Sequence, residues 1–261
     1  MTTPNPTEVL ALIDQAAAEG WTELDLSGQG LTELPKEIGK LTQLKTLILG
    51  KVEKWDWSSG EYAPKLMTNE LRSLPDELAA LDNLQSLDLS GNPLQSVPDC
   101  VFQLRGLESL KLTAVGLTEV PEAIAQFTNL TELHLSKNDL PELFRAIGYL
   151  KTLKILDCQS SQIREIPEGI AQLQNLTELD LGQNQIKELP DSITQLHNLT
   201  ELDLSNNQIK EIPESIAQLQ NLTALALWSN QIKEIPEGIA QLQNLTALAL
   251  WSNQIKEIPE S

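Results

Sequence analysis

A repeat of 23 residues runs through most of this chain and limits what it can fold into. Its rows begin at Trp21, at Leu44 and then every 23 residues from Leu84 to Leu245. The row at 199–221 reads LTELDLSNNQIKEIPESIAQLQN, and the common pattern is LxxLxLxxNxLxxLPxxIxxLxx. Such self-similarity is typical of solenoids, in which each repeat contacts only its neighbours.

Each row predicts a short strand, a turn and a helical return segment. Leu202 and Leu204 alternate with Asp203, as in a strand that buries one face. A proline then opens the return segment, where its restricted φ suits a first helical position. The turn carries an asparagine whose amide is expected to bond backbone groups of neighbouring rows, in a ladder of Asn92, Asn138, Asn184, Asn207, Asn230 and Asn253. The ladder is expected to fail at Gln29, Val115 and Ser161.

One row cannot bury its own apolar face, whereas stacked rows share a continuous core. The predicted fold is therefore an α/β repeat solenoid, a horseshoe of ten rows over residues 21–261. A parallel sheet should line its concave face, and short helical segments should form its convex face. Residues 1–20 are expected to form an N-terminal capping helix, with Thr7 as N-cap and Gly20 as stop. A partner-binding helix is the alternative for this segment.

The row pattern resembles the leucine-rich-repeat family in its typical 23-residue class. Rows such as LTELPKEIGKLTQL and IPEGIAQLQNLTELDL are similar to the N-terminal repeats of bacterial, especially cyanobacterial, Roco-type GTPases, and to Ras-binding leucine-rich scaffolds. The resemblance implies a protein–protein interaction module, serving as the sensing or regulatory repeat region of a larger signalling protein. A free-standing bacterial effector or adaptor is the alternative. GTPase activity is not carried over, because no GxxxxGK[ST] phosphate loop is present.

Charge and cysteine content narrow the class of partner. Acidic residues outnumber basic ones by 37 to 18, giving a formal net charge of −19, which argues against nucleic acid or an anionic membrane as main partner. Cys100 and Cys158 are too few for a disulfide-stabilised secreted domain. The first twenty residues contain no Lys or Arg and do not resemble a signal peptide. A cytoplasmic protein with a protein partner is therefore expected.

The largest departure from the repeat is an insertion loop at 51–68, in a second row that runs 40 residues. It contains Trp55, Trp57 and Tyr62, and such aromatic residues often anchor interfaces. The loop is expected either to overhang the concave face as a partner-binding element or to fold back as a small satellite core.

A second departure lies on the concave face of the last two rows. Ala226, Ala249, Trp228 and Trp251 stand where earlier rows carry polar residues, so stacking should set the two indoles side by side on an alanine floor. This patch predicts a site for a partner or for self-association, or it is only a copied row. The last repeat is truncated and uncapped after Pro259. Three explanations are open: a fragment of a longer protein, which we favour, end-to-end association, or a frayed repeat.

The third departure places Lys111 and His134, with Lys137, on the concave side between acidic zones. It predicts either a site for an acidic group or ordinary solvated surface. No metal-ligand spacing and no GxSxG elbow is present, so no catalytic residue, cofactor or metal is expected. An enzyme site between the insertion loop and the concave face is the minor alternative. The other concave carboxylates are interpreted as solubilising surface.

Overall fold

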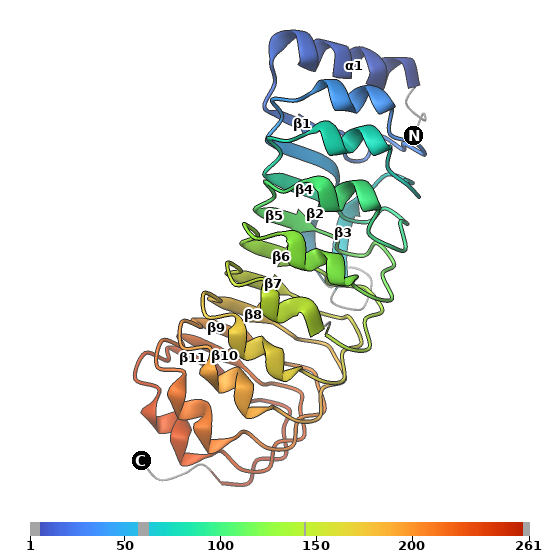
Figure 1. The fold of residues 1–261 in the computed structure, drawn as a ribbon. Coiled ribbons are helices and arrows are strands. Elements are labelled where there is room, and N and C mark those ends of the chain that lie inside the picture. Colours follow the sequence, from blue (N-terminus) through green and yellow to red (C-terminus); the bar gives the residue numbers. More distant parts are fainter. Residues whose placement is uncertain (1–5, 57–62, 144, 258–261) are drawn as a thin grey trace. The chain divides into compact units, whose positions relative to one another are not determined.

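The computed structural model describes residues 6–56, 63–143 and 145–257, which group into two compact units. The N-terminal unit is Met1–Leu130 and the C-terminal unit is Thr131–Ser261. Within each unit, short strands alternate with 3-10 turns of five residues, and consecutive rows stack in register (Figure 1). This is the predicted leucine-rich-repeat solenoid.

The N-terminal unit begins with helix α1 and continues through four stacked rows. Its elements are α1 (Pro6–Glu19), β1 (Glu23–Asp25), η1 (Lys36–Lys40), β2 (Thr46–Asp56), β3 (Ala63–Met67), η2 (Asp76–Ala80), β4 (Ser86–Leu89), η3 (Asp99–Gln103), β5 (Ser109–Lys111) and η4 (Glu122–Gln126). Strands β1, β2, β4 and β5 pair in parallel in that order. Helix α1 buries Val9, Ile13 and Ala16 and packs beside η1. Thr7 lies inside this helix and is not its N-cap, whereas Gly20 adopts a φ of 70° just after its end.

The C-terminal unit is the more regular of the two. Its elements are β6 (Glu132–His134), η5 (Arg145–Tyr149), β7 (Ile155–Asp157), η6 (Glu168–Gln172), β8 (Glu178–Asp180), η7 (Asp191–Gln195), β9 (Glu201–Asp203), η8 (Glu214–Gln218), β10 (Ala224–Ala226), η9 (Glu237–Gln241) and β11 (Ala247–Ala249). All neighbouring strands pair in parallel and without a register shift. The middle residue of each strand is a leucine. Leu179, Leu202 and Leu225 are at most 2% exposed, whereas Leu248 of the last strand is 41% exposed.

The predicted helical return segments are 3-10 turns of five residues. Each turn that follows a proline starts one residue after it, and the proline is the N-cap with an extended backbone, as at Pro213 (φ −67°, ψ 146°). The Pro213 carbonyl accepts the N–H of Ile216 at 3.0 Å, which closes the 3-10 turn. The prediction of proline at the first helical position is therefore wrong by one residue. Proline still suits this place, because an N-cap needs no backbone donor.

The asparagine ladder forms as predicted in the C-terminal unit. The Asn207 amide donates to the carbonyls of Leu181 at 2.9 Å and Leu204 at 3.1 Å, and its Oδ1 accepts the N–H of Ile186 at 2.9 Å. Ser161 is not the expected failure, because its hydroxyl donates to the Leu135 carbonyl at 3.0 Å. That carbonyl lies 26 residues back, the same offset that Asn207 uses to reach Leu181. Serine thus retains the donor half of the asparagine's role.

The insertion is a β-hairpin rather than the predicted loop. Strand β2 runs past the sheet and turns back as β3, with the antiparallel pairs Val52↔Leu66 and Trp55↔Pro64. The pairing of β2 with β3 gives the backbone groups of the insertion regular hydrogen bonds to each other. In an irregular loop, these groups would have to bond to solvent instead. At the branch point, Gly50 passes so close to the Ser90 carbonyl that a Cβ atom there would collide with it.

Candidate functional site

A hollow of about 700 Å³ lies over the strand face of the C-terminal unit, lined by residues from β6 to β11. Each strand from β6 to β11 presents two outward residues, one on each side of its central leucine, because side chains alternate along a strand. The parallel register therefore sorts the outward residues into columns across the sheet. One column reads His134, Asp157, Asp180, Asp203 and then two alanines.

The aspartates of this column share one local geometry. Oδ1 of each accepts the backbone N–H two residues on, from Gln159 at 3.0 Å, Gly182 at 2.9 Å and Ser205 at 2.8 Å. Aspartate commonly closes a strand in this way. The bond fixes each carboxylate at the strand end, so the row spacing alone sets the distance from one to the next.

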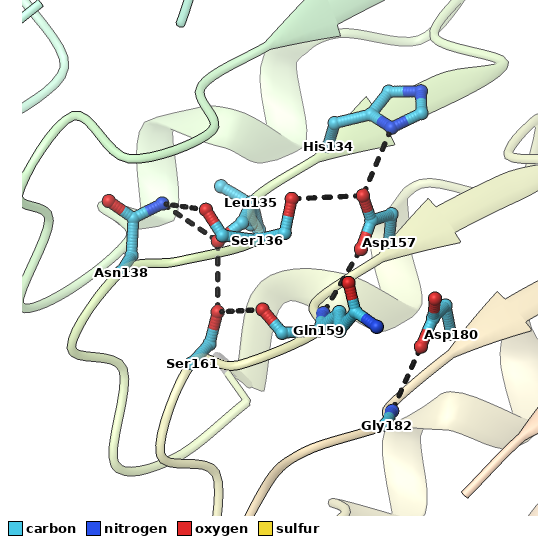
Figure 2. A network of polar contacts seen from close by, with 9 residues as sticks. All are labelled: His134, Leu135, Ser136, Asn138, Asp157, Gln159, Ser161, Asp180 and Gly182. Carbon is cyan, nitrogen blue, oxygen red and sulfur yellow. Dashed lines mark hydrogen bonds and ion pairs between the residues drawn. The ribbon is translucent and has the colours of Figure 1, made fainter. Parts of the chain in front are cut away.

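At one end of the column, His134 and Ser136 both contact Asp157 (Figure 2). Nδ1 of His134 lies 3.4 Å from Asp157 Oδ2, and the Ser136 hydroxyl donates to the same oxygen at 2.9 Å. The side chains of His134 and Asp157 are only 23% and 17% exposed. His134 is therefore half-buried beside a carboxylate, and its role in binding stays a prediction. Because the Ser136 hydroxyl donates to the carboxylate and not to the imidazole, the cluster lacks the serine–histidine bond of a hydrolytic triad.

Asp180 is the most perturbed carboxyl in the column. Partial burial, followed by repulsion from Asp157 and Asp203, raises its pKa to about 8, although the N–H of Gly182 opposes the shift. A carboxyl group with this pKa holds a proton at neutral pH. The interpretation of these residues as merely solubilising surface is therefore wrong for Asp180.

The other end of the hollow is apolar. Ala224 and Ala226 on β10, with Ala247 and Ala249 on β11, replace the acidic residues of β8 and β9. Trp228 and Trp251 follow these strands and stack with ring centroids 4.5 Å apart and planes 4° apart. Trp251 is 61% exposed and Trp228 is half-buried. The identical rows predicted this pairing, because the same side chain recurs at the same place one row later.

The remaining predicted residues lie in the N-terminal unit or outside the described residues. Trp55 is half-buried on β2 of the hairpin, and Trp57 and Tyr62 lie outside the described residues. Lys111 is half-buried on β5 and pairs in register with Asp88. Its joint site with His134 stays a prediction, as does a role for the hairpin in binding.

The carboxylate column was missed as a site by sequence reasoning. Its signal was present, because Asp157, Asp180 and Asp203 recur at one row position with no lysine at the neighbouring outward positions. In the described part of the chain, no group of three or more His, Cys, Asp or Glu side chains has an arrangement suited to a metal ion. Within the same residues, no helix is long and apolar enough to cross a membrane. Cys100 and Cys158 are buried free thiols whose pKa values burial raises, which makes them poor nucleophiles.

Comparison with known families agrees with the architecture. Models described as leucine-rich repeat region, leucine rich repeat and leucine rich repeats (2 copies) match residues 65–157, 151–209 and 197–241. The chain is a leucine-rich-repeat protein. A search of curated protein sequences found no match to it.

Solved leucine-rich-repeat structures are similar over most of this leucine-rich-repeat protein. A leucine-rich-repeat protein of Leptospira interrogans is 35% identical with a TM-score of 0.83, over 93% of this chain and 59% of that one. The ectodomain of the Arabidopsis thaliana receptor kinase GASSHO1/SCHENGEN3, in complex with CASPARIAN STRIP INTEGRITY FACTOR 2, is 31% identical with a TM-score of 0.71, over 85% and 26%. Internalin C2 of Listeria monocytogenes is 26% identical with a TM-score of 0.70, over 86% and 94%. The chain thus spans less than two thirds of the first two relatives.

Proposed function

We propose that this leucine-rich-repeat protein is a protein-binding module that holds its partner on the strand face of the C-terminal unit. The stacked pair of Trp228 and Trp251, of which Trp251 is 61% exposed, carries the proposal. Tryptophan is among the residues that contribute most to protein interfaces, since a large rigid ring buries much apolar area at little entropic cost. The structure of the Arabidopsis relative is of a complex with CASPARIAN STRIP INTEGRITY FACTOR 2, which supports a binding role for this type of scaffold.

The pair serves no interior packing, which is why a surface role fits it. The row of Trp228 is already closed by buried leucines, Leu225 and Leu227, that match those of the acidic rows. The indole of Trp251 is exposed to solvent, and the alanines of β10 and β11 make the neighbouring part of the hollow apolar. Exposed aromatic surface joined to a hollow is characteristic of interaction sites.

Removing the pair tests the proposal. The double variant Trp228→Ala, Trp251→Ala should lose at least about tenfold in affinity for a partner captured by the wild-type chain, as expected of a central aromatic anchor. Tyr149→Ala is the matched control, because Tyr149 is an aromatic residue 70% exposed on turn η5 of the same unit. Capture from native lysate, quantified by mass spectrometry, compares the three proteins. Equal capture by all three would remove the strand face from consideration.

A finer proposal concerns the protein in which this module acts. The likeness of its rows to Roco-type repeats supports a regulatory region of a larger signalling protein, and the bacterial relatives support a free-standing effector or adaptor as second candidate. Sequencing the gene beyond the codon for Ser261 distinguishes them. An in-frame GTPase or kinase domain supports the first candidate, and a stop codon supports the second.

A further inference from the structure

We infer that the strand face of the C-terminal unit takes a basic, extended polypeptide segment whose cationic side chains lie on the aspartate column and whose apolar side chain covers the alanine floor beside the tryptophans. This inference rests on the proposed function and names the chemical class of the partner. It depends on the change from acidic to apolar residues along the hollow, not on the aspartates alone.

The acidic half of the hollow has no lysine or arginine of its own. Its lining includes Asp157, Glu178, Asp180, Glu201 and Asp203, and contains no lysine or arginine. Within the described part of the chain, none of these five carboxyls forms an ion pair with a lysine or arginine, and His134 beside Asp157 is the one basic side chain. Such an excess of one charge attracts a partner of the opposite charge and rejects an acidic one.

The apolar half begins at β10, which pairs with β9 in the same parallel register as the acidic strands do. Asp203 on β9 pairs in register with Ala226 on β10, and Ala226 with Ala249 on β11. A ligand lying across the strands therefore meets carboxylates first and then alanine methyls and the face of Trp251. A small polyvalent cation would satisfy only the first half, whereas a polypeptide with basic and apolar side chains satisfies both.

The size of the face fits a short segment. Five steps between neighbouring strands separate β6 from β11, and at about 4.8 Å a step they span about 24 Å. An extended chain rises about 3.3 Å per residue, so about seven residues cover that length. The openness of the face to solvent at Trp251 leaves room for such a segment to pass across the sheet.

The N-terminal unit already contains the contact proposed here. Lys51 forms an ion pair with Asp25, which occupies the row position of Asp180 in its own row. Although burial opposes it, the bonds from Lys51 and from Ser27 bring the pKa of Asp25 below its usual value. In the aspartate column, burial and neighbouring carboxylates raise the pKa of Asp180 instead. A cation from a ligand would supply there what Lys51 supplies to Asp25, with release of the Asp180 proton.

A display library of random heptapeptides, selected against the full chain at low salt, tests the inference. Enriched peptides should combine arginine or lysine with a nearby leucine or aromatic residue, and they should elute as salt is raised. For these peptides, the Asp180→Asn, Asp203→Asn double variant should lose at least about tenfold in affinity. Asparagine preserves the acceptor for the Gly182 and Ser205 N–H groups, so the strand ends stay closed.

Asp88→Asn is the matched control, because Asp88 accepts the Ser90 N–H at 3.0 Å in the N-terminal unit and lies outside the hollow. Its affinity should equal that of the wild type. Neutral or acidic peptides that depend on Trp228 and Trp251, or basic peptides indifferent to Asp180→Asn, Asp203→Asn, would overturn the inference and leave the proposed function standing. A selection that yields no peptide dependent on either pair would overturn both.

Discussion

The rows of β9 and β10 share one interior and present opposite surfaces. Their central leucines, Leu202 and Leu225, are 2% and 1% exposed, and their asparagines make matching bonds to the row before. On the outer face, Glu201 and Asp203 of one row stand beside Ala224 and Ala226 of the next. The repeat therefore constrains the positions that stack, and leaves the outward positions free to set what the face can bind.

The largest effect should come from the ladder that both rows share. Asn207→Ala and Asn230→Ala should each lower the free energy of unfolding by about 3 kcal/mol. Each variant leaves one buried N–H without its acceptor, and it takes one of two amide donors from each of two buried carbonyls. The Asn230 amide bonds Leu204 at 2.9 Å and Leu227 at 3.1 Å, much as Asn207 bonds its own two carbonyls. Urea denaturation of the two variants measures the effect.

Equal losses of unfolding free energy would show that the ladder stabilises the acidic and the apolar rows to the same extent. A loss at Asn207 that exceeded the loss at Asn230 by more than about 1 kcal/mol would mean that the outer face contributes to the interior. Asn175→Ala is the control, because its amide donates to the Lys151 carbonyl from an exposed position. Its loss should stay well below that of either ladder variant.

The interior could be predicted from the sequence because its leucines and asparagines recur from row to row. The properties of the outer face depend on distances between side chains of different rows, which the sequence of one row does not give. The leucines, the ladder and the Trp228–Trp251 pair follow directly from the period. The pKa of Asp180 does not, because it arises from the approach of carboxylates in three separate rows. The role of Ser161 was missed because a hydroxyl reaches the carbonyl that an amide would reach. The hairpin was missed because β2 continues beyond the leucine pattern.

The next largest effect is a pH dependence of the free energy of unfolding, which we expect from the acidic rows and not from the apolar ones. The pKa of Asp180 is raised to about 8 in the folded chain, so the folded state binds a proton that the unfolded state has released. Stability should therefore fall as pH rises from about 5 to about 7, by up to about 1.4 kcal/mol per pH unit, and level off above the folded pKa. The groups that face this carboxyl across the sheet are Asp157 on β7 and Asp203 on β9.

Asp180→Asn removes this proton and should flatten the dependence. Unfolding of wild type and variant in urea, at several pH values between about 5 and about 8, gives the difference directly. Asp88→Asn provides the comparison for a row without stacked carboxylates on both sides. Parallel curves for wild type and Asp180→Asn would show that Asp180 titrates as an ordinary surface acid.

The smallest effect should come from the apolar rows and should not depend on pH. Trp251→Ala removes one half of a stacked pair that lies outside the core, so the free energy of unfolding should fall by only about 1 kcal/mol. The same loss is expected at about pH 5 and about pH 8, because the shift at Asp180 arises from its burial and from Asp157 and Asp203, not from the indoles. Urea unfolding at the two pH values measures it. A loss that grew with pH would couple the tryptophans to the aspartate column and contradict the division of the hollow into two independent halves.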